Sequence, residues 1–222
     1  MQLFVAFCGE GPIDERLIIN LSERIIEEYL FQNSITAEIS WLRIKKTGNS
    51  EESVISASIQ SKSQDFLIFH RDADFESVEI CISNHFQSGL NKIEQKKKED
   101  ACKNIVLSIP VQETEAWILC DKPKFKDLIE TDLDNRTLNL TYKIGRIESI
   151  ADPKRIIEDA IKIHKDSLPR RKRKFAVNLS EIYERAGQEV DMDLLEHLRS
   201  FQLFRNNLTD MLNLITEIKT PS

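Results

Sequence analysis

The most constraining feature of this sequence is a short apolar run that ends abruptly in acid. Four large hydrophobic residues stand in a row from Phe66 to Phe69, and Asp72 and Asp74 follow after only two intervening positions. An apolar run of this length without helical spacing is typical of a buried strand. In an open α/β sheet, ligands bind in the crevice outside the carboxyl ends of the strands. The sequence therefore predicts a buried strand that brings two carboxylates to a ligand-binding edge.

These two carboxylates suggest a particular kind of ligand. Neighbouring carboxylates repel each other unless a proton or a cation lies between them. Mg²⁺ and Mn²⁺ bind oxygen ligands of this type and keep waters that a phosphate can replace. In the alternative interpretation, Asp72 and Asp74 only begin a loop and cap the following helix.

Composition limits the possible classes of protein. The chain has 222 residues, of which 41% are hydrophobic and 31% charged, as expected for one large domain or a domain with an extension. It contains no apolar run long enough to span a membrane and no basic leader, so we expect a cytoplasmic protein. Its four cysteines form no CxxC pair, which predicts buried, reduced thiols. The net charge of -6 argues against binding nucleic acid through bulk charge, but allows a local basic channel or a bound metal.

A second apolar run, Leu3 to Cys8, predicts the first strand. It leads to Glu10, which lies between two glycines, and then to an amphipathic helix with Asp14 in its first turn. Glycines permit a tight turn and a close approach of backbone to ligand. If the two strands are neighbours, Glu10 and Asp14 face the same crevice as Asp72 and Asp74. Stabilisation of the helix dipole also explains Asp14, but it does not explain Glu10.

A third strand end also carries acid. The run 105–109 predicts a buried strand, and Glu113 and Glu115 follow it. These two side chains cannot lie on the same face of a regular helix, so one can reach the site while the other caps or pairs. Trp117 is predicted to anchor the core. The segment 36–44 alternates in polarity and predicts a strand at or near the edge of the sheet.

The second half of the chain reads as mostly helical. Asp152 and Pro153 form a helix start, and Lys154 follows in the first turn. A cation there is unfavourable to the helix dipole unless an anion or carboxylate holds it, so Lys154 is either a functional residue or a solvent lysine. Apolar spacing predicts two further helices, over 175–186 and 193–218, which cover the sheet or provide a surface for a partner.

Positive charge is concentrated in one place. Five consecutive cations follow Pro169. Such a run is usually a solvated loop, but a site that handles nucleic acid needs local positive charge. Arg71 can contact phosphate or pair with a neighbouring acid. The predicted nucleic-acid contacts are Arg71, Arg170, Arg171, Lys172, Arg173 and Lys174.

Two motifs, each at a predicted strand end, resemble those of Toprim domains. The segment 10–17 resembles their EGxxDxxxL signature, and Asp72-Ala73-Asp74 resembles their DxD, in the expected order. Toprim is the metal-dependent module of topoisomerases, bacterial primases and the overcoming-lysogenisation-defect nucleases. Residues 110–121, the Asp152-Pro153-Lys154 segment and the helical C-terminal half extend the likeness over nearly the whole chain. With these parts included, the chain resembles small Toprim-like proteins encoded beside an ABC-type ATPase in bacterial defence loci.

The resemblance implies a fold and a set of site residues. The fold is a Toprim-like α/β domain over residues 1–121, with a mainly parallel central sheet flanked by helices, and a mostly helical extension over 122–222 packed on it. Glu115 (or Glu113) and Lys154 take the places of a later acid and a lysine of the nuclease branch. The resemblance also implies two bound Mg²⁺ or Mn²⁺ ions, and their ligands would be Glu10, Asp14, Asp72 and Asp74.

The expected function is Mg²⁺-dependent hydrolysis of phosphodiesters in DNA or RNA, by a nuclease of bacterial anti-phage defence that an ATPase partner gates. Two metals can activate a water and stabilise the leaving oxygen, while a lysine neutralises the phosphate. Hydrolysis is favoured because the chain has no tyrosine placed as a topoisomerase nucleophile and no primase zinc module. One alternative is a weakly catalytic or non-catalytic adaptor that binds the ATPase through its helical half. Another is nucleotidyl or phosphoryl transfer on the same metals.

Overall fold

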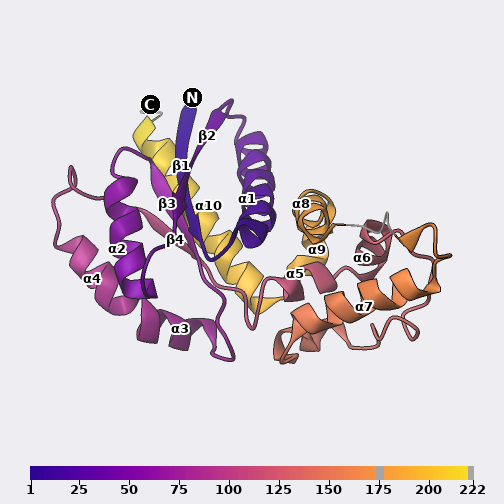
Figure 1. Cartoon of the computed structure of the whole chain (residues 1–222). Helices are drawn as coiled ribbons and strands as arrows, with labels where there is room; N and C mark the ends of the chain where they lie inside the picture. The colour runs from indigo at the N-terminus through magenta and orange to yellow at the C-terminus, as the bar shows by residue number, and fades with distance from the viewer. Residues whose placement is uncertain (174–177, 220–222) are drawn as a thin grey trace.

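The apolar runs form the strands of one parallel sheet. The computed structural model describes residues 1–173 and 178–219 (Figure 1). The order of the strands is β2-β1-β3-β4, and every neighbouring pair is parallel. The strands are β1 (Gln2–Gly9), β2 (Glu38–Lys45), β3 (Phe66–His70) and β4 (Ile105–Ser108). The predicted α/β fold is confirmed, and β1 and β3, which precede the two acidic motifs, are direct neighbours.

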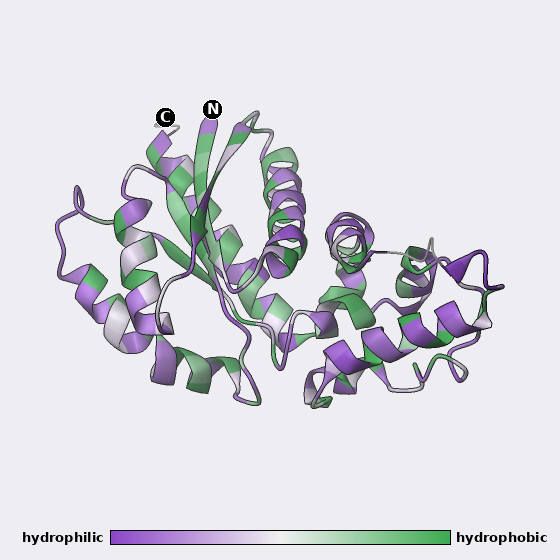
Figure 2. Ribbon diagram, viewed as in Figure 1, coloured by the Kyte–Doolittle hydropathy of each residue, from purple (hydrophilic) through white to green (hydrophobic). Residues whose placement is uncertain are grey.

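Helices cover both faces of the sheet (Figures 1 and 2). One face packs against α1 (Pro12–Gln32) and α10 (Arg199–Lys219). The other packs against α2 (Ser50–Gln60), α3 (Val78–His85) and α4 (Gln87–Glu94). Side chains alternate between the faces, as they must in a strand, so both sides of the central strands are apolar. The α1 face receives Val5, Phe7, Phe66 and Ile68, whereas the α2 face receives Ala6, Cys8, Leu67 and Phe69.

Between β4 and α10 the chain builds a second, helical lobe beside the sheet (Figure 1). Its 3₁₀ helix η1 spans Ile144–Ser149. Its α-helices are α5 (Glu115–Leu119), α6 (Lys122–Leu128), α7 (Pro153–Ser167), α8 (Leu179–Glu189) and α9 (Met192–Leu195). Helix α8 lies against α1, and Gly187 allows this contact because a Cβ there would lie 2.8 Å from the Leu17 carbonyl oxygen. This contact fixes the lobe next to the first turn of α1.

The predicted helix over 193–218 is in fact two helices, because Glu148 interrupts it. The two carboxylate oxygens of Glu148 each accept a hydrogen bond of 3.0 Å, one from the N–H of Arg199 and one from that of Ser200. This caps a new helix, α10, which runs onto the sheet. The indole N–H of Trp117 donates to Ser200 Oγ at 2.9 Å, and its ring packs against α10, so Trp117 is the predicted core anchor.

Three further features bear on the predictions. Asp152 accepts the N–H of Arg155 at 2.8 Å and Pro153 begins α7, so the predicted helix start is confirmed. The predicted helix over 175–186 begins at Leu179 in the described part of the chain, and residues 175–177 lie outside it. The four cysteines are free and buried, and no described helix is long and apolar enough to cross a membrane.

Candidate functional site

Three carboxylates meet around Thr114, at the carboxyl ends of β1, β3 and β4. The Thr114 N–H donates to Asp72 Oδ1 at 3.2 Å. Its hydroxyl lies 2.9 Å from Asp14 Oδ1 and 3.3 Å from Glu115 Oε2. One buried threonine therefore connects acids delivered by the first turn of α1, the loop after β3 and the start of α5.

The Thr114 hydroxyl cannot donate to both of its carboxylate neighbours, because it has one proton. A proton on Glu115 would let both contacts form as hydrogen bonds. Glu115 is buried, and this burial raises the pKa of its carboxyl. Its other oxygen, Oε1, accepts a hydrogen bond from the hydroxyl of Tyr183, which reaches it from α8. Glu115 is therefore a carboxyl that can hold a proton inside the crevice.

Asp72 carries the strongest electrostatic signature in the crevice. Burial raises the pKa of Asp72 to about 9, with further contributions from the carboxylates of Asp14, Glu115, Glu10 and Glu113. Among described residues, its only ion-pair neighbour is His70, whose Nε2 lies 3.7 Å from Asp72 Oδ1. The ionised form of Asp72 is therefore unfavourable here, and a cation bound in the crevice would stabilise it.

His70 does not supply that compensating charge. It is fully buried, which lowers the pKa of the imidazole. Nδ1 lies 3.1 Å from the carbonyl oxygen of Ser108, so in the neutral ring Nδ1–H donates there and Nε2 is left as an acceptor. Nε2 has no hydrogen-bond partner among the described residues.

Glu10 and Asp74 lie in the same region but are compensated by cations. Arg71 connects them, with Nη1 3.9 Å from Glu10 Oε1 and Nη2 3.3 Å from Asp74 Oδ2. Lys46 also forms an ion pair with Glu10. Asp74 has a left-handed backbone with φ of 47° and turns outward, so 62% of its side chain is exposed. Arg71 thus pairs with acids, one of the two roles predicted for it.

The structure separates the roles of the two glutamates around Thr114. Glu113 Oε2 accepts the backbone N–H of Lys154 at 3.2 Å, so Glu113 lies at the N-terminus of α7. Burial raises the pKa of Glu113, and this hydrogen bond partly offsets the effect. Glu115, by contrast, reaches Asp14 through Thr114.

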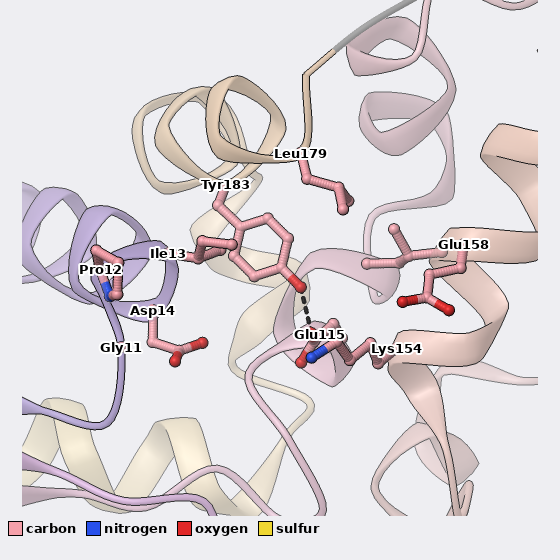
Figure 3. Close-up of a pocket in the computed structure, with 10 residues that line it drawn as sticks. Gly11, Pro12, Ile13, Asp14, Glu115, Lys154, Glu158, Leu179 and Tyr183 are labelled. Carbon is pink, nitrogen blue, oxygen red and sulfur yellow. Dashed lines mark hydrogen bonds between the residues drawn. The ribbon is translucent and has the colours of Figure 1, made fainter.

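A small pocket adjoins this crevice, between the N-terminus of α1 and helices α5, α7 and α8 (Figure 3). Its volume is about 180 Å³. Asp14 and Glu115 line its inner side, and the side chain of Lys154 enters it from α7. Lys154 therefore lies at the same pocket as two of the acids, and its predicted role in the reaction stays a prediction.

The basic run is not brought to the crevice. Residues 170–173 are exposed and lie beyond the C-terminus of α7, whereas Lys154 lies in its first turn. At about 1.5 Å per residue, this 15-residue helix separates them by roughly 20 Å. The Arg173 guanidinium donates to the carbonyls of Asp166 and Leu168, both at 3.0 Å. Lys174 lies outside the described residues.

Two hydroxyls were absent from the predicted site. Thr114 stands between the two predicted glutamates, and a hydroxyl between two acids was a signal that could have been used. Tyr183 gave no such signal, because it lies 68 positions from Glu115 and meets it only through the packing of α8 on α1.

The donor chemistry of the crevice suits a hard divalent cation, although the ligands are not preassembled. Clustered carboxylate oxygens favour Mg²⁺ or Mn²⁺ over softer metals. Within residues 1–173 and 178–219, no group of three or more His, Cys, Asp or Glu side chains is already arranged to hold a metal ion. A cation bound beside Asp72 would displace its proton and stabilise the carboxylate, which is why the crevice suits a cation.

Comparisons of the chain with protein-family models, curated proteins and solved structures find no match. Function is therefore inferred from the residues of this chain and their geometry.

Proposed function

We propose that this protein is a Toprim-like phosphodiesterase that uses Mg²⁺ or Mn²⁺ to hydrolyse nucleic acid. The observation that supports it best is the meeting of Asp14, Asp72 and Glu115 around Thr114. Among the described residues, no lysine or arginine forms an ion pair with these three acids. They lie at the carboxyl end of a parallel sheet, where ligands bind in folds of this kind.

The residues divide the chemistry between them. Asp14 and Asp72, with Glu10 and Asp74 at the outer side, would hold the cations. Bound there, divalent cations supply an activated water and charge stabilisation for the leaving oxygen. Glu115 holds a proton that it can exchange with a reacting oxygen, and Tyr183 fixes its orientation. Lys154 neutralises charge on the phosphate from the side of α7.

The biological setting follows from the resemblance. We propose a nuclease of bacterial anti-phage defence, gated by an ABC-type ATPase that contacts the helical lobe. Exposed charges at residues 170–173, about 20 Å from Lys154, offer a contact for nucleic acid away from the reaction site.

A second candidate function, an adaptor with weak or no catalysis, is favoured by a specific observation. Arg71 and Lys46 already compensate Glu10, and Arg71 also pairs with Asp74. Two of the four proposed ligands are thus paired with cations of the protein. In the adaptor, these pairs persist and the helical lobe binds its partner.

The first experiment is calorimetric titration of Mn²⁺ into the wild-type protein and two variants, with cleavage of labelled single-stranded DNA, double-stranded DNA and RNA followed on the same samples. Asp72→Asn removes the central acid, and Asp159→Asn is the matched control at an exposed pair on α7. We expect binding and cleavage in the wild type and control, and neither in Asp72→Asn. No binding of Mn²⁺ to the wild type would contradict the metal site and favour the adaptor.

A further inference from the structure

The pocket beside the acids has the composition of a site for a flat, partly polar group. Its walls are formed by Pro12, Ile13, Ile157, Leu179 and the ring of Tyr183 (Figure 3). Apolar and aromatic walls of this kind receive heterocyclic rings by stacking and dispersion.

The size of the pocket restricts what enters it. A volume of about 180 Å³ lies below the range of about 300–1,000 Å³ usual for whole small-molecule ligands. The pocket therefore accepts a single ring system, and the rest of its ligand must lie outside.

Two charged side chains at the pocket have no partner of their own among the described residues. Lys154 and Glu158 lie one turn apart on α7, and both line the pocket. Among the described residues, neither the Lys154 amino group nor the Glu158 carboxylate forms a hydrogen bond or a close ion pair. With Lys154 directed at the phosphate, the Glu158 carboxylate remains as an acceptor at the edge of the apolar slot, where the exocyclic amino groups of nucleobases can donate to it.

The pocket is continuous with the proposed reaction site, because Asp14 and Glu115 belong to both. A phosphodiester lying over these acids has its own nucleoside within reach of the pocket. We propose that the pocket receives one unpaired nucleobase of the substrate strand, next to the phosphate that reacts. This inference rests on the proposed function and adds the substrate class.

The consequence is a preference for unpaired nucleotides. In a duplex a base is stacked and paired, and it must leave the stack before it can enter an enclosed site. Single strands and unpaired loops present their bases without that penalty. The protein therefore acts on single-stranded nucleic acid, or on unpaired nucleotides within a folded one.

Two variants fill the pocket and one serves as the matched control. Leu179→Trp and Ile13→Trp place a large ring in it from α8 and α1, and the Ile13 side chain is already 37% exposed, so the core is not disturbed. Leu214→Trp makes the same kind of change on α10, outside the pocket, at a side chain that is 45% exposed. Thermal unfolding of all three checks that they fold.

The test measures fluorescence anisotropy of a labelled short single strand and of its duplex, with Ca²⁺ in place of Mg²⁺ so that binding is separated from turnover. We expect the wild type and Leu214→Trp to bind the single strand at least about fivefold more tightly, the lower end for stacking of one base. Both pocket variants should lose this preference. Equal binding of both forms by the wild type, or an unchanged preference in both folded pocket variants, would overturn the proposal.

Cleavage with Mg²⁺ on the same samples separates this inference from the proposed function. Cleavage without any preference for unpaired nucleotides leaves the nuclease standing and removes the base pocket. A preference that the pocket variants abolish, without cleavage of any substrate, leaves the pocket standing and removes the nuclease.

Discussion

Asp72 and Asp74 are separated by one residue, yet they lie in two halves of the crevice that differ in charge compensation. In the inner half, Asp72 is 15% exposed and surrounded by other carboxylates. In the outer half, Asp74 is 62% exposed and paired with Arg71. Asp74 also has a left-handed backbone, with φ of 47°.

The comparison teaches that a motif with two acids need not contain two equivalent ligands. In the inner half no described lysine or arginine pairs with the acids, and the pKa values of Asp72 and Glu115 are raised, so a proton or a bound cation stabilises these two groups. The outer half is already neutralised by Arg71 and Lys46. We therefore expect substitutions in the inner half to have large effects, and those in the outer half small ones.

The largest effect is expected for Asp72→Asn. This substitution removes the acid whose pKa the neighbouring carboxylates raise. The rate of cleavage with Mg²⁺ should fall on the order of 10³-fold, as for loss of a main electrostatic group in an active site. Initial rates at saturating Mg²⁺ measure it. Asp74→Asn, in the outer half, is the comparison, and an equal loss in both variants would show that the two halves do not differ.

The second effect is on stability and its pH dependence. Because the pKa of Asp72 is raised from 3.8 to about 9, the folded metal-free protein binds more protons than the unfolded chain between those values. The free energy of unfolding must then decrease as pH rises through this window. The effect of Asp72 should reach a few kcal/mol, on the order of 1.4 kcal/mol per pH unit. Glu115, with its raised pKa, contributes in the same direction.

Urea unfolding with EDTA, from about pH 5 to pH 9, tests this slope. Asp72→Asn should flatten it and should be more stable than the wild type above neutrality. The lowered pKa of His70 gives a slope of opposite sign below about 6.5, so the difference between wild type and variant is the informative quantity. A variant that is less stable than the wild type at every pH would contradict the unfavourable ionisation of Asp72 in the folded protein.

A smaller effect is expected at Thr114. Thr114→Val keeps the N–H that binds Asp72 and removes the hydroxyl between Asp14 and Glu115. Groups that orient ligands in this way typically contribute about 10- to 100-fold to metal affinity or activity. Titration with Mn²⁺ measures the metal affinity and cleavage rates measure the activity. Thr114→Ser should restore both the affinity and the activity. Failure of serine to restore activity would indicate a packing role instead.

The smallest effect is expected in the outer half. Lys46→Gln breaks an ion pair with Glu10, which is 31% exposed, so stability should change by no more than about 1 kcal/mol. Cleavage should stay within about fivefold of the wild type, measured at low and high salt. A larger loss would make Lys46 part of the reaction site and remove the distinction between the halves.

Some of these features could be predicted from sequence because they depend on local pattern. Apolar runs bounded by polar turns gave the central strands, and the acids directly after them had to lie at one edge of a parallel sheet. The role of Arg71 could not be decided, because its pairing with Glu10 joins two different strand ends. The helix break before Arg199 was missed because its cause, Glu148, lies 51 positions away. Tyr183 was missed for the same reason.

The position of the basic run could not be predicted from sequence, and its contact with nucleic acid stays a prediction. Charge alone associated residues 170–174 with the reaction site, since this is the longest run of consecutive cations in the sequence. The length of α7 places residues 170–173 far from Lys154 and the acids. Apolar periodicity predicts that a helix forms, but it does not predict in which direction the helix runs from the site. The boundary at residue 121 stays a prediction, although α10 returns to the sheet from well beyond it.

Because α10 comes late in the sequence, one face of the sheet is fully covered only late in synthesis. The sheet is complete in sequence at Ser108, but the helix that covers part of one face begins only at Arg199. At about 5–20 residues per second, a ribosome needs on the order of 10 s to synthesise the intervening segment. During that time apolar surface beside Val106 and Trp117 lacks its final partner. We therefore expect a nascent chain that stops before α10 to expose this surface to chaperones.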